Sequence, residues 1–414
     1  MKSGITIKLH YYNPGHETAV WQDTTNYTPP LNVRKMTTDL AFLPAWYAQE
    51  GDYVWIDGQS PLPLTAWLPE GIRPLGLPLT RRELEAKAAS LPPMVAEPWG
   101  LSPHSLQLFQ ALKQAYGLSL DIPVWKREYT ALTSRQTAAA CLEEIGRLLP
   151  DEQIPRPPVF FSDMEELETC LLRQTGAWLL KAPYSSSGRG LLWLTGNRLS
   201  ENDRKRAGGI LRKQGLLSVE QALDKVLDFA LEFHADGKGG LRYEGISRFE
   251  TNSRGAYKGN QLRAQASLEE ELLSYAGADS LCRIRQALAQ TLRLSFAGLY
   301  TGYLGVDMLV YKKEAAFAIH PCIEINLRHT MGMAALRIYE HYLDPDAEGL
   351  FHIAYEPLPG AACARHRLME QTYPPSLRSG RLHEGYLSLC PVTEETHYLA
   401  YVLAGSKKTR IFRP

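Results

Sequence analysis

The residues with the clearest chemical signature lie in the stretch LLKAPYSSSGRGLL, residues 179–192. The apolar pairs at its two ends predict β-strands, and the polar run between them predicts a tight loop. A loop of this kind exposes backbone N–H groups and hydroxyls on one side, and its glycines let an anion approach closely. The pattern predicts a phosphate-binding loop, with a solvated hairpin turn as the alternative. Its candidate contacts are Lys181, Ser185, Ser186, Ser187, Gly188, Arg189 and Gly190.

A second group of polar residues lies in two segments that we expect to pair as a long hairpin, residues 303–311 and 315–326. Residues two apart on a strand point to the same face, so Glu324 and Asn326 present oxygen atoms side by side. Asp307 on the partner strand can lie opposite them. An acidic group in an apolar strand is costly unless it is paired or bound to a metal. Three oxygen ligands suit Mg²⁺, and a salt-bridged sheet surface is the alternative.

Several elements must position these groups. The segment Thr133-Ser134-Arg135 predicts an N-capped start for a helix over residues 136–149. The proline-rich residues 154–158 predict an extended linker, and a strand over 216–220 ends in an acid. An apolar stripe predicts that residues 267–299 are largely helical, whereas the basic, glycine-bearing stretch 254–260 predicts a loop.

The first 130 residues alternate short apolar runs with proline- and glycine-rich connections, which predicts an α/β unit with strands near 53–56 and 71–79. Residues 5–9 alternate like a first strand. The sequence Asn13-Pro14-Gly15-His16-Glu17 follows it, at the end of the strand where α/β sheets bind ligands. His16 and Glu17 are therefore site candidates, and a turn without chemistry is the alternative. Residues 346–414 predict short strands that complete a sheet or an edge.

Composition excludes several classes of function. The 45 basic residues balance 45 acidic ones, so no global charge favours nucleic acid or an anionic membrane. No apolar run approaches the roughly 20 residues that span a bilayer, and residues 1–13 lack the apolar core of a signal peptide. The six cysteines have no CxxC pair and no zinc spacing, which favours buried free thiols in a reducing cytoplasm.

A phosphate loop, a strand ending in glutamate and an Asp…Glu-x-Asn hairpin, in this order and spacing, together resemble the ATP-grasp superfamily. The resemblance covers roughly residues 130–345. It implies a mixed α/β and α+β fold, with an N-terminal α/β domain over 1–130 that precedes the ATP-grasp domain. The ATP-grasp small subdomain with the phosphate loop would span 131–215, and the large subdomain with the hinge and metal site 216–345. Residues 346–414 would form a C-terminal extension.

The resemblance also implies roles for particular residues. Arg135 replaces the usual lysine on the ATP phosphates, and Lys181 matches the second phosphate-binding lysine. Glu220, Gln221 and Leu223 match the hinge that binds adenine. Asp228 matches the ribose acid only with a one-residue insertion. Asp307, Glu324 and Asn326 match the metal ligands, and Arg328 matches an arginine that contacts the acyl-phosphate. Arg248, Arg254 and Lys258 fall where substrate often binds, although an exposed basic loop explains them equally well.

The resemblance implies an ATP- and Mg²⁺-dependent ligase that joins a carboxylate to an amine or thiol through an acyl-phosphate. The expected partners are small molecules, a peptide among the candidates, with no nucleic acid and no membrane. Two other functions stay open: an ATP-grasp phosphotransferase and a nucleotide-binding protein without catalysis. We expect a cytoplasmic protein, and a homodimer stays open.

Overall fold

The computed structural model describes residues 6–57, 62–185, 190–252 and 255–406. The chain divides into two compact units. Unit 1 comprises Met1–Lys126, Lys258–Gln265 and Arg328–Pro414, and unit 2 comprises Arg127–Tyr257 and Ala266–Leu327. The C-terminal residues 346–414 therefore share a compact unit with the N-terminal residues. The division into 1–130, 131–215, 216–345 and 346–414 stays a prediction.

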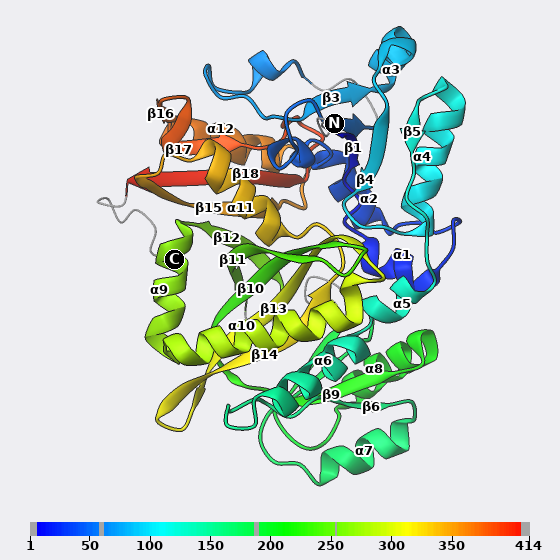
Figure 1. Ribbon diagram of the computed structural model, residues 1–414, viewed down its shortest axis with the longest axis vertical. Coiled ribbons are helices and arrows are strands. Elements are labelled where there is room, and N and C mark those ends of the chain that lie inside the picture. Colours follow the sequence, from blue (N-terminus) through cyan, green and yellow to red (C-terminus); the bar gives the residue numbers. More distant parts are fainter. Residues whose placement is uncertain (1–5, 58–61, 186–189, 253–254, 407–414) are drawn as a thin grey trace. The chain divides into compact units, whose positions relative to one another are not determined.

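Unit 1 begins with a parallel sheet in the strand order β3-β2-β1-β4-β5 (Figure 1). From β1 the chain adds β2 and β3 on one side and then crosses to add β4 and β5 on the other. The order therefore reverses between β1 and β4, the place where open α/β sheets bind ligands. The strands are β1 (Ile7–Tyr11), β2 (Tyr53–Ile56), β3 (Leu77–Thr80), β4 (Met94–Pro98) and β5 (Leu120–Asp121).

Short helical elements connect these strands, and two of them begin with reciprocal side-chain caps. In α3 the Thr80 hydroxyl accepts from the Glu83 N–H while Glu83 accepts from the Thr80 N–H. Ser102 and Ser105 form the same arrangement at α4, and such caps satisfy backbone donors that a helix start leaves unpaired. The elements are α1 (His16–Gln22), α2 (Leu31–Asp39), η1 (Leu43–Trp46), η2 (Leu64–Ala66), α3 (Arg81–Lys87), η3 (Ala88–Ser90) and α4 (Pro103–Tyr116).

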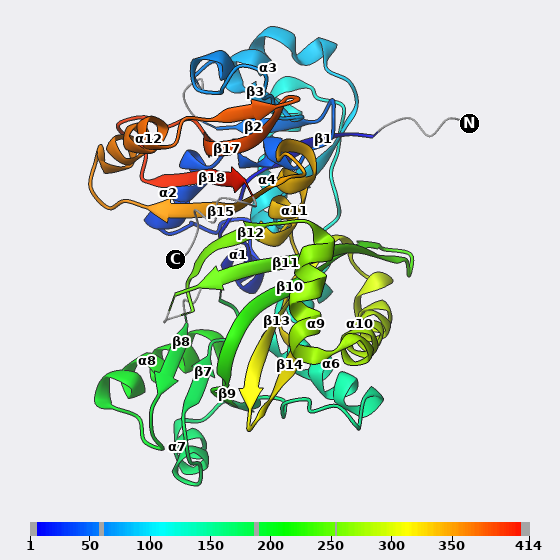
Figure 2. The ribbon, with the colours of Figure 1, turned by 90° about the vertical axis from the view of Figure 1, so that its left-hand side faces the viewer.

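The later parts of unit 1 form antiparallel strands in the order β12-β15-β18-β17-β16 (Figure 2). Two helices accompany them. The pairing confirms that residues 346–414 build sheet structure, and it adds a helix that the sequence did not predict. The elements are β12 (Tyr257–Leu262), α11 (Met331–Tyr342), β15 (Ala347–Tyr355), α12 (Ala361–Thr372), β16 (Ser376–Arg378), β17 (Arg381–Ser388) and β18 (Tyr398–Ser406).

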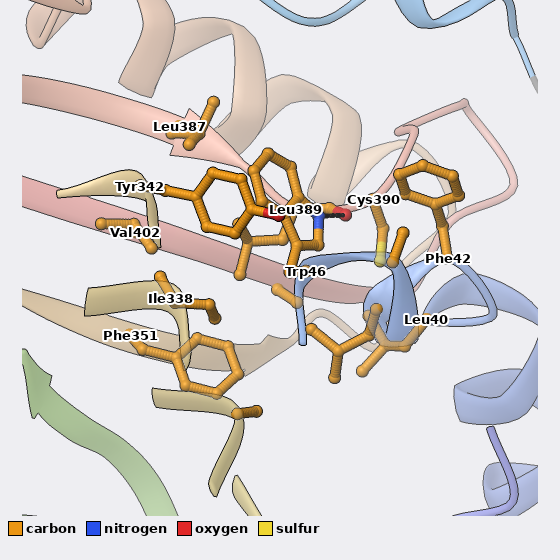
Figure 3. Packing of buried hydrophobic residues seen from close by; sticks show 14 of the residues in the cluster. Leu40, Phe42, Trp46, Ile338, Tyr342, Phe351, Leu387, Leu389, Cys390 and Val402 are labelled. Atoms are coloured by element: carbon orange, nitrogen blue, oxygen red, sulfur yellow. Dashed lines mark hydrogen bonds between the residues drawn. The ribbon is translucent and has the colours of Figure 1, made fainter. Parts of the chain in front are cut away.

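One hydrophobic core joins the segments of unit 1 (Figure 3). Trp46 lies at its centre, fully buried, with its ring 4.8 Å from that of Tyr342. The Trp46 indole N–H donates to the Leu389 carbonyl at 2.6 Å, which satisfies its polar atom. Phe351 and Val402 from the antiparallel strands pack into the same cluster. Burial of these side chains fixes the C-terminal strands within unit 1.

Unit 2 contains a small sheet in the order β6-β9-β7-β8, which packs with α7 and α8 around one core. The neighbouring strands are antiparallel. The N-cap of α6 is Ser134, whose hydroxyl accepts from the Gln136 N–H, as predicted. The elements are α5 (Glu128–Thr133), α6 (Arg135–Leu148), β6 (Val159–Phe161), α7 (Met164–Leu172), β7 (Trp178–Lys181), β8 (Leu191–Leu194), α8 (Glu201–Gln214) and β9 (Leu217–Gln221).

The remainder of unit 2 is built on antiparallel strands in the order β14-β13-β10-β11. The predicted long hairpin is confirmed as β13 and β14. The predicted helical region 267–299 is confirmed as two helices and a π-helical turn. The elements are β10 (Asp224–Asp236), β11 (Leu241–Thr251), α9 (Gln265–Ala276), α10 (Ala278–Leu292), η4 (Arg293–Ala297), β13 (Thr301–Lys313) and β14 (Ala316–Asn326).

One local prediction is wrong. Residues 257–260 belong to strand β12 and not to a loop. A Cβ atom added to Gly259 would lie 2.3 Å from the carbonyl oxygen of Phe351. Any larger residue at this position would therefore collide with β15. The glycine that suggests a loop in the sequence is thus required for close strand packing. The mixed α/β and α+β fold class is confirmed. Among the described residues, no helix is long and apolar enough to cross a membrane.

Candidate functional site

The predicted metal ligands lie together on the hairpin of β13 and β14. Asp307 is directly opposite Glu324, and Asn326 is opposite Gly305 two positions along the same strand. Residues opposite each other on antiparallel strands, and residues two apart, share one face. The Glu324 side chain is 21% exposed and Asn326 is buried. Two carboxylates and one amide oxygen therefore gather at one end of the hairpin, and this oxygen donor set suits a hard cation such as Mg²⁺.

Arg135, the first residue of α6, reaches this group. Its Nη2 donates to Glu324 Oε2 at 2.9 Å, and its Nε donates to the carbonyl of Ala182 at 3.1 Å. The Arg135 side chain is 8% exposed. A guanidinium buried to this degree requires a partner anion. The first residue of α6, Arg135, thus places a cation from the start of the predicted small subdomain beside the predicted metal ligands.

Lys181 ends β7 and forms an ion pair with Glu220, which lies on the neighbouring strand β9. Lys181 is buried, at 5% exposed. The sequence assigned Lys181 to phosphate and Glu220 to adenine, and the structure brings these two side chains into direct contact. The opposite charges of Lys181 and Glu220 therefore neutralise each other.

A cavity of about 870 Å³ lies along the predicted hinge. It is lined by Glu220, Gln221 and Leu223, the three residues assigned to adenine, together with Trp178 and residues of the linker 154–157. Its size suits a small-molecule ligand. None of the described residues assigned to phosphate or metal lines this cavity. Of the three sets of assigned residues, the cavity therefore contains the hinge set.

His320 on β14 also lines this cavity, and the sequence analysis missed it. Burial lowers the pKa of the His320 imidazole to about 4, while the charges of Glu220 and Lys181 act on it with opposite sign. His320 is therefore neutral at pH 7. Its Nδ1 accepts from the Cys322 N–H at 3.4 Å, so the ring offers its Nε2–H as a donor. The sequence around His320 reads as an ordinary strand, so it does not distinguish His320 from a histidine buried in the core.

Asp228 and Arg248, assigned to ribose and substrate, lie on the paired strands β10 and β11. The Asp228 carboxylate accepts from Lys225 Nζ at 2.6 Å and from the Thr251 hydroxyl at 2.9 Å. Arg248 Nη1 donates to the Asp228 carbonyl at 2.9 Å. The structure thus brings the two residues together, and their roles in binding stay predictions.

The phosphate loop is described only at its two ends. Ser186, Ser187, Gly188 and Arg189 lie outside the described residues, as does Arg254. The Ala182 N–H donates to the Gly190 carbonyl at 3.1 Å, and Gly190 has the positive φ of 83° that the sequence predicts for a loop glycine. Ser185 Oγ is buried and has no hydrogen-bond partner among the described residues.

A second group of charged residues lies in unit 1, where the order of the parallel sheet reverses. Arg328 Nε donates to Glu17 Oε1 at 2.6 Å, and the side chains are 17% and 7% exposed. Burial opposes ionisation of Glu17, but Arg328 and its hydrogen bond hold the pKa of the Glu17 carboxyl below its usual value. The acid that pairs with Arg328 is therefore a buried residue that follows β1.

Next to this pair, buried and partly buried polar side chains form two further contact groups, which the backbone N–H of Lys8 links by donating to Asp52 Oδ1 at 2.8 Å. His329 Nε2 lies 3.0 Å from Glu97 Oε1, and Lys8 Nζ lies 3.2 Å from Glu97 Oε2. His10 Nε2 lies 3.0 Å from Asp52 Oδ2. Burial lowers the pKa of the His329 imidazole to about 4. The sequence placed His16 and Glu17 at this end of β1, and it missed Glu97, whose partner is 232 residues away.

Across the described residues, no group of three or more histidine, cysteine, aspartate and glutamate side chains has the arrangement of a metal site. The candidate metal ligands are two acids, Asp307 and Glu324, and one amide, Asn326. They therefore include only two of the four residue types named above. They fit a cation that takes few protein ligands and completes its shell with phosphate and water, as Mg²⁺ does.

No protein-family model and no curated protein sequence matches the chain. A solved biotin carboxylase–β,γ-ATP complex from Campylobacter jejuni matches with a TM-score of 0.53 and 12% identity over 97% of this chain and 89% of that one. An ADP complex of N5-carboxyaminoimidazole synthetase from Staphylococcus aureus matches with a TM-score of 0.49 and 10% identity over 97% and 94%. An L-amino acid ligase from Bacillus licheniformis matches with a TM-score of 0.42 and 12% identity over 96% and 93%.

The chain shares the fold of the Campylobacter jejuni biotin carboxylase structure, which agrees with the fold that the resemblance implies. The likeness to the Campylobacter jejuni structure extends over nearly the whole chain, and therefore includes the N-terminal and C-terminal regions that the motifs do not cover.

Proposed function

We propose that this protein is an ATP- and Mg²⁺-dependent ligase that joins a carboxylate to an amine or thiol. The observation that carries the proposal is the meeting of Arg135, Glu324 and Asp307 at the end of one hairpin. An assigned phosphate cation and two assigned metal ligands come from α6, β13 and β14, which are distant in the sequence. A binding protein without catalysis has no need of this arrangement.

In the proposed reaction, a carboxylate oxygen of the first substrate attacks the γ-phosphorus of ATP, and the bond from that phosphorus to the bridging oxygen breaks to release ADP. Arg135 and Lys181 hold the phosphate oxygens, exchanging their present partners Glu324 and Glu220 for the nucleotide. When bound to Asp307, Glu324 and Asn326, Mg²⁺ supplies positive charge toward the phosphates. Phosphoryl transfer depends on positioning and charge neutralisation, which these residues provide.

In the second step the amine or thiol attacks the acyl carbon, the carbon–oxygen bond to phosphate breaks, and inorganic phosphate leaves as the nucleophile loses a proton. Arg328 is assigned to the oxyanion of the tetrahedral species. A guanidinium fixed in place suits this role because it stabilises charge that appears only along the reaction path. Glu17 fixes Arg328 through the hydrogen bond to Nε.

We propose that the reaction takes place in a reducing cytoplasm, which agrees with six free cysteines.

Trapping of the acyl-phosphate tests this proposal. The protein is incubated with ATP, Mg²⁺, hydroxylamine and pooled small carboxylic acids, and hydroxamates are identified by mass spectrometry. The proposal predicts a hydroxamate of one acid that depends on ATP and is lost in Lys181→Met. ATP consumption with a stable phosphorylated alcohol or amine as the product, and no hydroxamate, would show a phosphotransferase instead.

A further inference from the structure

We propose that the cavity along the hinge is a separate ligand site, which binds a small planar heteroaromatic monoanion at the same time as the protein binds a nucleotide. The cavity has a volume of about 870 Å³, all of its lining residues belong to unit 2, and it is called here the back-hinge cavity. Its size suits a small molecule. Only the simultaneous binding of a nucleotide rests on the proposed function.

The back-hinge cavity lies mainly on the side of the small sheet that faces away from Lys181. Side chains alternate between the two faces of a strand. Lys181 and Glu220 belong to one face of β7 and β9 and form an ion pair there. Trp178, Val219 and Gln221 belong to the opposite face, which packs with α7 in one hydrophobic core. All three line the cavity, whereas Glu220 alone lines it from the described residues on the Lys181 face of these strands.

The other walls of the cavity lie away from the candidate metal ligands. Cys170 of α7 and Thr175 of the turn after α7 form one wall. Tyr311 and residues 312–314 at the tip of the β13–β14 hairpin form another. Tyr311 follows Asp307 by four residues on the same strand, which corresponds to about 13 Å. A ligand in the back-hinge cavity therefore does not reach the candidate metal site.

The inner wall of the cavity offers aromatic surface. The Trp178 indole N–H donates to the Thr175 carbonyl at 3.1 Å, and the Tyr311 hydroxyl donates to the Gln153 carbonyl at 3.0 Å. Because their polar atoms are already bonded, Trp178 and Tyr311 offer apolar ring surface to a ligand. Leu223 and the prolines of the linker add further apolar surface. Such a wall favours a flat aromatic molecule.

His320 adds one hydrogen-bond donor to this wall. It is 7% exposed and lines the cavity. Its Nδ1 accepts from the Cys322 N–H at 3.4 Å, while its Nε2 has no hydrogen-bond partner among the described residues. A purely apolar ligand that covered this donor would leave it unbonded, which is costly. The ligand therefore needs an acceptor, such as a ring nitrogen.

The charged side chains of the cavity favour a single negative charge on the ligand. Three cations and two carboxylates that line it are exposed and form no ion pair within the described part of the chain. These are Arg156, Lys312, Lys313, Asp224 and Glu314. The charge of Glu220 is neutralised by Lys181. One positive charge remains, so a monoanion complements the site better than a cation or a polyanion.

Bonds within the protein hold the walls in place. Glu152, just before the proline-rich linker, accepts from the Ser280 hydroxyl at 2.8 Å and pairs with Arg283 at 3.5 Å, so α10 holds this end of the linker. The hydrogen bond from Tyr311 to Gln153 joins the linker to β13. The linker prolines restrict their own backbone dihedrals. Walls fixed in this way lower the entropic cost of binding.

Cysteine labelling of the full-length protein tests the inference. Cys170 lines the cavity, and Cys282 on α10 does not. Both are half-buried, and each sulfur accepts a weak hydrogen bond from the glutamine four residues later, so Cys282 is a matched internal control. The protein is treated with N-ethylmaleimide with and without quinoline-6-carboxylate, a heteroaromatic monoanion, and peptide mass spectrometry measures both labelling rates. At about ten times its Kd, this compound should slow labelling of Cys170 about tenfold and leave Cys282 unchanged.

Two analogues of the compound test the ligand class. Quinoline-6-carboxamide lacks the negative charge and should bind about threefold more weakly, because the cations that it loses are exposed. Naphthalene-2-carboxylate lacks the ring nitrogen that accepts from His320 and should bind about tenfold more weakly. Equal protection of Cys170 by all three compounds would contradict the ligand class.

A double variant tests the charged side of the cavity. Lys312→Gln with Lys313→Gln should weaken binding of quinoline-6-carboxylate about threefold and leave binding of the carboxamide unchanged. Lys205→Gln with Lys213→Gln removes two exposed lysines of α8 that do not line the cavity, so this control should bind like the parent. Equal loss of affinity in both double variants would show a general effect of net charge and contradict the assignment.

An unreactive ATP analogue with Mg²⁺ distinguishes the back-hinge cavity from the nucleotide site. The analogue alone should leave labelling of Cys170 unchanged, and quinoline-6-carboxylate should protect Cys170 equally when the analogue is bound. Protection of Cys170 by the analogue, or loss of the compound's protection when the analogue is bound, would assign the cavity to the nucleotide and overturn the inference. So would equal protection of Cys282, or no protection of Cys170 by quinoline-6-carboxylate. Calorimetry on the same preparation measures binding of the analogue. Its failure to bind contradicts the proposed function, and labelling without nucleotide then still decides on the back-hinge cavity.

Discussion

Arg135 and Glu324 form a hydrogen-bonded ion pair of 2.9 Å between the start of α6 and the end of β14. One partner is assigned to the phosphates of ATP and the other to the metal. In this structure they neutralise each other, as do Lys181 and Glu220. Binding of a nucleotide with its cation would replace two internal ion pairs by contacts of each charge with the ligand. We therefore expect the charges of the proposed site to remain paired before and after binding.

Glu324→Gln tests the metal assignment. The change removes one charge but keeps an acceptor for Arg135, so we expect a stability loss of only about 1–2 kcal/mol. ATP turnover should fall below detection because a neutral amide is a weaker ligand for Mg²⁺. Thermal unfolding and ADP release measure the two effects. Glu144→Gln, which removes a carboxylate that pairs with Arg147 on the surface of α6, is the control and should retain turnover. Turnover equal to that of the parent would exclude Glu324 as a metal ligand.

Lys181→Met tests the phosphate assignment. Methionine retains the apolar stem and removes the ammonium, so ATP affinity should fall at least about tenfold through loss of a charge-assisted contact. Titration with an unreactive ATP analogue measures this loss. Lys205→Met is the control because Lys205 is 74% exposed and pairs with Glu201 one turn away on α8. Equal affinities of Lys181→Met and the control would refute the role of Lys181.

Arg328→Met, alone and combined with Glu17→Gln, distinguishes the effect of Arg328 on stability from its effect on the ligation rate. Its loss leaves the buried Glu17 carboxylate without its cation, which costs about 3–5 kcal/mol. The double variant Glu17→Gln with Arg328→Met should regain most of that stability. Ligation should stay slower than in the parent by about two orders of magnitude in both, since one oxyanion contact contributes about 3 kcal/mol.

Arg328→Lys keeps the charge and loses the planar fork, so it should fold like the parent and still ligate slowly. Nucleotide affinity that falls in step with the rate would instead place Arg328 on ATP. Single-turnover rates and analogue titrations on the same preparations distinguish these outcomes.

The alternation of the hairpin strands predicted the pairing of Asp307 with Glu324, because period-two patterns fix which residues share a face. It could not predict that Arg135 reaches Glu324, since the two are 189 residues apart and no local pattern encodes that contact. The same holds for Glu17 and Arg328, which are separated by 311 residues. The strand at 257–262 was missed because Gly259 and Asn260 have low strand propensity, and tertiary packing against β15 overrides it.

Stability should decrease as pH falls from about 6.5 toward 4. His16, His320 and His329 are buried, and burial lowers the pKa of each imidazole to about 4. The unfolded chain binds their protons from about pH 6.5 downward, whereas the folded chain resists them until about pH 4, so protonation favours unfolding in this window. Each histidine contributes about 1–3 kcal/mol to the effect. Urea unfolding at a series of pH values measures it.

The free energy of unfolding should be nearly constant between pH 7 and 8, where these histidines are neutral in either state. His320→Asn should reduce the slope between pH 4 and 6.5. A slope that begins only below pH 4.5 would assign the acid sensitivity to carboxylates such as Glu17, whose pKa is held low by Arg328.

The most direct test of the ligase assignment is product analysis by mass spectrometry after incubation with ATP, Mg²⁺ and a pool of small carboxylic acids, amines and thiols. The account predicts a new compound with the summed mass of one acid and one nucleophile less one water, formed in equal amount with ADP and inorganic phosphate. A product that instead equals one pool member plus a phosphoryl group, or ADP released without any joined product, would contradict it.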